Sequence, residues 1–111
     1  MTEISFPVEV IEGVPVVTAP EEIDISNAPL LQKALLEAAG PEHVLVVVDM
    51  SRTRFCDSAG LNALISADRR ARAEGGEVRL VITGGSVVRV VALTGVDRVI
   101  PIYASLEEAL T

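Results

Sequence analysis

The chain has 111 residues, enough for one domain, and half of them are hydrophobic, so a core can form without disulfide or metal support. The net charge of −7 and the aromatic content of 3% argue against a nucleic-acid partner, because phosphate binding requires clustered cations and single strands stack on aromatic rings. The sequence opens without a leader pattern, its apolar runs are too short for a bilayer, and the single cysteine, Cys56, suits a reducing compartment, so we expect a cytoplasmic protein that binds no membrane.

A β-hairpin is predicted at the start of the chain. Residues 6–11 alternate in the manner of a strand, Glu12-Gly13 is a turn signal, and residues 14–19 can return as the second arm. A loop is expected over residues 20–24. The next apolar residues recur at helical spacing (Leu31, Leu35 and Ala38), with Ser26 as cap, Pro29 in the first turn and Gly40-Pro41 as the stop.

The middle of the chain predicts a strand, a helix and a second strand. Residues 44–48 form an unbroken apolar run typical of a strand buried on both faces, and Asp49 at its end is expected to be a hydrogen bonder. A loop over residues 50–57 leads to a helix that Gly75-Gly76 stops, with its apolar residues on one side (Leu61, Leu64, Ile65 and Ala71). Residues 78–82 alternate again and predict a strand.

The last third of the chain contains one ambiguous segment. Five valines in residues 86–93 favour a strand, whereas Ser86 as cap and Gly95 as stop favour a helix, and we expect the helix. Residues 99–103 predict a final short strand. Ser105 and Glu108 form a capping box that opens a terminal helical turn or two.

The resulting element order is β-β-α-β-α-β-α-β-α. Strands that alternate with helices imply right-handed crossovers and a mostly parallel sheet, to which the hairpin adds an antiparallel edge. We therefore expect one α/β domain over residues 1–111, with a core of about residues 6–110 and helices packed on a mixed β-sheet.

The junction between the buried strand and the second helix is the most unusual strand-to-helix junction. Small residues at Ser58, Ala59 and Gly60 leave the helix entrance uncovered, so that a hydroxyl there can be reached from outside. Free N–H groups and the helix dipole make such an end receptive to an anion, which lets a serine there carry a phosphate. The alternative is that Asp57 or Ser58 is an ordinary N-cap.

This junction also carries a family resemblance. The stretches 46–51 (VVVDMS) and 55–61 (FCDSAGL) resemble the STAS domain and, within it, the bacterial anti-sigma factor antagonists, whose D-S-[SA]-G-L helix entrance contains the phosphorylated serine. Glu22-Ile23-Asp24 is similar to the family's E-[IL]-D loop. Residues 93–96 (LTGV) and 105–110 (SLEEAL) resemble its later segments, so the likeness covers nearly the whole chain.

The resemblance implies a binding module that is switched by phosphorylation at Ser58. Its unphosphorylated form would bind an anti-sigma factor with serine kinase activity and free a sigma factor, and a serine phosphatase would restore it. The implied partner surface comprises Asp24, Asp57, Ser58, Ala59 and Gly60, with the Asp24 loop beside the helix entrance. The alternative is a STAS scaffold or accessory module of a stressosome or lipid-transport system.

We expect no catalytic activity, no cofactor and no metal. A nucleophile at Cys56 or Ser58 needs a base in reach, and the single histidine, His43, belongs to another loop and has no second ligand for zinc. Cys56 is instead expected to be a small buried hydrophobe. An aspartyl-phosphate receiver with Asp49 as acceptor would need a late lysine, whereas the sequence has Lys33 alone.

Overall fold

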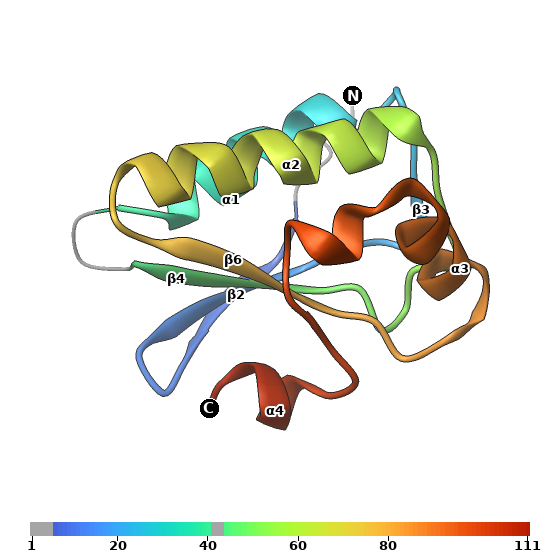
Figure 1. Cartoon of the computed structure of the whole chain (residues 1–111). Helices are drawn as coiled ribbons and strands as arrows, with labels where there is room; N and C mark the ends of the chain where they lie inside the picture. The colour runs from blue at the N-terminus through green and yellow to red at the C-terminus, as the bar shows by residue number, and fades with distance from the viewer. Residues whose placement is uncertain (1–5, 41–43) are drawn as a thin grey trace.

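A computed structural model describes residues 6–40 and 44–111, and Figure 1 shows how the elements are arranged. The strands are β1 (Val8–Ile11), β2 (Val14–Thr18), β3 (Glu22–Ile23), β4 (Leu45–Asp49), β5 (Phe55–Cys56), β6 (Glu77–Val81) and β7 (Ile102–Tyr103). The helices are α1 (Ala28–Ala38), α2 (Ser58–Ala73), α3 (Gly85–Thr94) and α4 (Leu106–Ala109), with a 3-10 turn at Val96–Arg98. The predicted class, a single α/β domain with a mixed sheet, is confirmed.

The main sheet, within the described residues, has the strand order β1-β2-β4-β6-β7. Glu12 and Gly13 both have positive φ and make the tight turn that lets β1 pair antiparallel with β2. The remaining neighbours pair in parallel, and helices α1, α2 and α3 make the crossovers between them. The predicted antiparallel edge on a mostly parallel sheet is therefore confirmed.

Both faces of the sheet are covered. Figure 1 shows α1 and α2 side by side over one face and α4 on the other. Along β4, Val46 and Val48 pack in the cluster under α1 and α2, whereas Val47 packs with Ala109 of α4. Because both alternate sets are buried, this strand has no polar alternation, and the predicted burial on both faces is confirmed.

Arg79 on β6 contacts helix α4 and adds to its apolar packing on the sheet. The Arg79 guanidinium donates to the Ala109 carbonyl oxygen at 2.9 Å and forms a 2.8 Å ion pair with Glu77. It also lies over the Tyr103 ring, 5.5 Å from the centroid. These contacts keep a helix of four residues on the second face, where Ala109 is fully buried.

A small second sheet was not predicted. The sequence predicts loops over residues 20–24 and 50–57, but within them β3 and β5 pair in parallel, with Glu22 opposite Phe55 and Ile23 opposite Cys56. These segments continue the adjacent strands β2 and β4 and therefore leave the sheet side by side. Strands of two residues are too short to show an alternating pattern, which explains the error.

Several predicted boundaries need correction. Asn27, not Ser26, precedes α1, because the Ser26 hydroxyl binds Asp24. Helix α3 is confirmed with its stop at Gly95, but it follows Gly84, and Ser86 lies inside it and is not its cap. The last strand is shorter than residues 99–103 because the 3-10 turn takes up the approach to it. Ser105 caps α4 as predicted by accepting from the Glu108 N–H.

Among the helices in the described part of the chain, none is long and apolar enough to cross a membrane. The predicted stop at Gly40-Pro41 is met only in part, because α1 ends at Ala38 and Pro41 lies outside the described residues. His43, interpreted as a loop residue, also lies outside them.

Candidate functional site

Ser58 is the first residue of α2, and its side chain is exposed. Asp57 precedes it in an extended conformation, and the Asp57 Oδ1 atom accepts the Gly60 N–H at 3.0 Å. Asp57 is thus the N-cap, one of the two residues that the sequence offered for that role. The N–H groups at the first two helical positions, Ser58 and Ala59, have no acceptor within an α-helix. An exposed hydroxyl therefore lies at the positive end of a helix dipole.

Gly60 allows this helix entrance to sit directly on the small sheet. A Cβ atom at residue 60 would lie 2.6 Å from the Cys56 Sγ and 2.7 Å from the Ile23 Cγ2, closer than a carbon atom can pack against either sulfur or carbon. Gly60 itself is buried. The structure thus places Gly60 beneath the surface that carries Ser58, where its lack of a side chain fixes the position of the helix start.

The segment with Asp24 lies beside this helix entrance. The Asp57 N–H donates to the Ile23 carbonyl oxygen at 3.0 Å, which extends the pairing of β3 with β5 up to the cap. Asp24 follows directly, and its carboxylate accepts the Ser26 hydroxyl and the Ser26 N–H, the latter at 2.9 Å. These hydrogen bonds, the hydroxyl foremost, lower the pKa of Asp24 below its ordinary value and keep it a carboxylate.

The loop around Asp24 is also held by Asn27. The Asn27 side chain accepts the Asp24 N–H and donates to the Glu22 carbonyl oxygen, both at 2.9 Å. The turn between β3 and α1 therefore presents Asp24 from a backbone with its own hydrogen-bond network. Of the sequence-predicted site residues, the structure brings Asp24, Asp57, Ser58 and Ala59 to one surface, with Gly60 below them.

Two exposed apolar side chains near the site were not predicted from the sequence. Ile25, next to Asp24, is 78% exposed, and Phe55, three residues before Ser58, is 51% exposed. In the sequence Phe55 belongs to the loop expected over residues 50–57, and Ile25 lies between the loop expected over residues 20–24 and the cap expected at Ser26. Neither position has a periodicity that separates an outward from an inward side chain. Large apolar groups on the same end of a molecule are a common mark of a partner surface.

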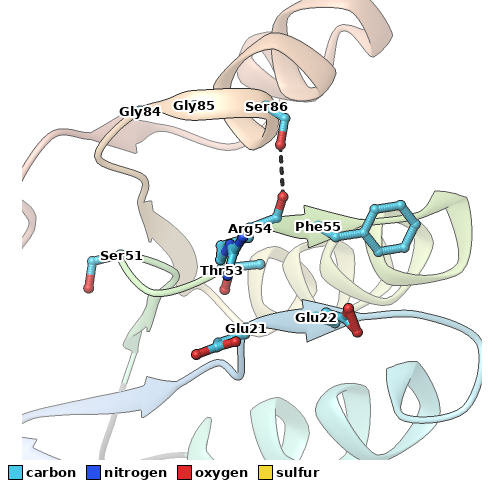
Figure 2. Close-up of a pocket in the computed structure, with 9 residues that line it drawn as sticks. All are labelled: Glu21, Glu22, Ser51, Thr53, Arg54, Phe55, Gly84, Gly85 and Ser86. Atoms are coloured by element: carbon cyan, nitrogen blue, oxygen red, sulfur yellow. Dashed lines mark hydrogen bonds between the residues drawn. The ribbon is translucent and has the colours of Figure 1, made fainter.

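A polar pocket of about 590 Å³ opens between the small sheet and the start of α3. Figure 2 shows Glu21 and Glu22 on one side of it and Gly84, Gly85 and Ser86 on the other. The pocket wall is fixed by two hydroxyls: Thr53 donates to the Pro20 carbonyl oxygen at 2.8 Å, and Ser86 donates to the Arg54 carbonyl oxygen at 2.7 Å. The pocket has no signature in the sequence, because it depends on the unpredicted pairing of β3 with β5.

Cys56 lies under the site and does not contribute a reactive group. Its side chain is buried, as expected from the sequence, and burial first and the Asp57 charge second raise the pKa of the thiol to about 11. A thiol with this pKa stays neutral at physiological pH. In the described part of the chain, moreover, no group of three or more His, Cys, Asp and Glu side chains is arranged to hold a metal ion.

Asp49 and Asp68 are acids with structural partners outside this surface. Asp49 accepts the Ser51 N–H at 3.0 Å, which confirms its expected role at the end of a strand. Asp68, which the sequence analysis did not single out, is fully buried and pairs with Arg72 at 2.9 Å. Arg72 also donates to the Val99 carbonyl oxygen at 3.2 Å, so the pair ties α2 to the approach to β7.

Known proteins are similar to this chain over nearly its whole length. The STAS domain family model matches residues 5–109. The anti-sigma-F factor antagonist RsfB of Mycobacterium tuberculosis is 32% identical over 101 residues, which is 89% of this chain and 80% of that protein. The crystal structure of an anti-sigma factor antagonist from Mycobacterium paratuberculosis aligns with a TM-score of 0.85 at 33% identity, covering 96% of this chain and 90% of the other. SpoIIAA, a Bacillus cell fate determinant, shares the fold in its phosphorylated form, with a TM-score of 0.71 at 19% identity and 96% of each chain covered.

Proposed function

The chain belongs to the STAS domain family, and on this premise we propose that it is an anti-sigma factor antagonist. In this proposal the unphosphorylated protein binds an anti-sigma factor that has serine kinase activity, and this binding releases a sigma factor. The names of its relatives from two mycobacteria support the antagonist role. The observation that carries the proposal is the exposed Ser58 hydroxyl at the first position of a capped helix.

Phosphorylation of Ser58 is the proposed switch. The Ser58 oxygen would attack the γ-phosphorus of ATP held by the partner, the bond to the ADP oxygen would break, and the hydroxyl proton would pass to a base of the kinase. The helix dipole and the N–H groups of the first turn favour the new phosphate, so α2 can carry it without unwinding. A serine phosphatase would return the hydroxyl with water as the co-reactant.

The proposed partner surface is centred on Ser58 and includes Asp24, Asp57 and Ala59. Gly60 belongs to it as the buried residue on which the helix entrance rests. Both carboxylates are already engaged in hydrogen bonds within the chain, Asp57 with Gly60 and Asp24 with Ser26. The surface therefore meets the partner without having to be ordered first, which lowers the entropic cost of binding.

We propose that this protein regulates by binding and carries no catalytic activity of its own. Its relatives are named as anti-sigma factor antagonists, and we propose that it acts in the cytoplasm, where sigma factors act. The Asp57 side chain, the acid nearest Ser58 in sequence, caps the helix through its Oδ1 atom. The alternative, a scaffold or accessory module, lacks comparable support from these relatives.

The test is a phosphorylation assay with purified proteins. Each anti-sigma factor of the source organism with a kinase-like fold is incubated with this protein and ATP, and mass spectrometry locates the phosphate. We expect one phosphate, at Ser58, and none on the Ser58→Ala variant. Ser51, Ser66 and Ser86 are internal controls, because Ser66 lies within α2 and the other two belong to the polar pocket or its rim. Phosphate on Ser58→Ala would refute the proposed switch.

A further inference from the structure

A shallow groove of about 280 Å³ runs between α1 and α2 and begins next to Ser58. Its lining combines apolar and amide or hydroxyl side chains and contains no charged residue: Ile25, Ala28, Pro29, Gln32, Ala59, Asn62, Ala63 and Ser66. Across the whole chain 23% of the residues are charged. The groove is thus an uncharged strip on an acidic protein.

The groove is continuous with the proposed phosphorylation site. Ala59, the neighbour of Ser58 in the chain, is one of its lining residues, and Ile25 forms its outer wall next to Asp24. A kinase that places its active site on Ser58 buries on the order of 800 Å² of this protein, a patch much wider than one side chain. Any partner centred on Ser58 therefore covers the near end of the groove as well.

The two sides of Ser58 differ in chemistry. On the α3 side the pocket carries Glu21, Glu22 and Arg54, which are charged groups that are costly to strip of water. On the α1 side the groove contains the Ile25 side chain, which is 78% exposed, and alanines form much of the remaining lining. Buried apolar anchors at the centre of an interface contribute most of its affinity, whereas charged rims contribute to steering and specificity.

We propose that the groove between α1 and α2 receives an apolar side chain of the serine-kinase partner and thereby fixes that partner over Ser58. The proposal rests on the proposed function above and names the contact that recognises the partner. Asp24 is the chain neighbour of the groove residue Ile25, and its carboxylate favours a partner whose anchor is flanked by basic residues. The polar pocket on the α3 side stays hydrated and takes no part in this recognition.

The experiment compares two groove variants with one matched control. Ile25→Ala removes the outer wall, and Asn62→Trp fills the groove from an exposed position of α2. Leu93→Ala is the control. Leu93 is 79% exposed, close to the 78% of Ile25, but it lies at the end of α3 and outside the groove. Binding to the purified kinase-fold anti-sigma factor that phosphorylates the wild type is measured by calorimetry, and folding is checked by thermal melting.

We expect both groove variants to bind at least tenfold more weakly and to be phosphorylated more slowly, while Leu93→Ala matches the wild type. Wild-type affinity in both groove variants would overturn the inference and leave the proposed function intact. Absence of any wild-type binding would overturn both. Sedimentation that shows a wild-type dimer which Ile25→Ala dissociates would assign the groove to a second copy of this chain, and would also overturn the inference.

Discussion

The Oδ1 atom of Asp57 lies 3.0 Å from the backbone nitrogen of Gly60, and this hydrogen bond fixes where α2 begins. It has two consequences for the site. The acid next to Ser58 is committed to the helix, and the Ser58 hydroxyl is left exposed at the first helical position. The cap and the proposed acceptor are therefore adjacent residues with separate tasks, and substitutions can separate them.

Asp57→Ala is expected to lower the free energy of unfolding by about 1 kcal/mol, the usual cost of losing an N-cap side chain. Asp57→Ser keeps an oxygen that can accept the Gly60 N–H, so it should stay within a few tenths of a kcal/mol of the wild type. Urea denaturation of the three proteins measures the difference. Equal midpoints for Asp57→Ala and wild type would show that the cap does not support α2.

Gly60→Ala is expected to destabilise the protein by about 1–3 kcal/mol, because a methyl group there meets Ile23 and Cys56 inside contact distance. Gly40→Ala is the matched control: among the residues that the structure describes, nothing lies within 4 Å of a Cβ at residue 40, and the φ angle of Gly40 is not positive. Thermal melting of both variants distinguishes a packing requirement from a general effect of adding a methyl group. A Gly60→Ala protein as stable as Gly40→Ala would rule out the packing role.

The sequence predicted the fold well wherever local chemistry and periodicity agree. The hairpin follows from Glu12-Gly13, and β4 from an unbroken apolar run. Predicted caps succeeded where the side chain had no competing partner, as at Ser105. They failed at Ser26 and Ser86, whose hydroxyls bind Asp24 and the Arg54 carbonyl oxygen, respectively. Such competition depends on which acceptors, side chain or backbone, lie nearby in the folded chain, and it leaves no trace in the spacing of residues.

The candidate site was predictable only in part for a related reason. Ser58 could be found because small residues at a strand-to-helix junction form a local pattern, and the family resemblance selected it further. Ile25 and Phe55 could not, since their exposure depends on how the segments around β3 and β5 pair. The groove and the polar pocket each combine residues from distant parts of the chain, so neither has a sequence signature.

Cys56 should react slowly until the protein unfolds. Its pKa is raised to about 11 in the folded state from an ordinary value of 9.0, so at pH 9 we expect alkylation by iodoacetamide to be about fiftyfold slower in native protein than in urea, from the thiolate fraction alone. The linked stability is fully present below about pH 9 and is lost as the pH rises toward about 11. Urea midpoints measured from pH 8 to pH 10.5 should fall less in Cys56→Ala. Rapid alkylation of native protein would contradict the buried, neutral thiol.

Ser58→Glu should fold normally and yet bind the kinase partner weakly, whereas Ser58→Ala should bind well and escape inactivation. A carboxylate at the first position of α2 interacts favourably with the dipole and the free N–H groups, so the melting temperature should change little. The loss falls on the interface, where the ATP phosphates of the partner must come close to residue 58. At about 6 Å and an effective dielectric near 20, each unit-charge pair costs on the order of 3 kcal/mol, which is roughly a hundredfold in affinity. Calorimetry on both variants checks the expected affinities, and thermal melting checks that both variants fold normally. Tight binding by Ser58→Glu would contradict the electrostatic account, and unfolding of Ser58→Glu would contradict the helix-end argument instead.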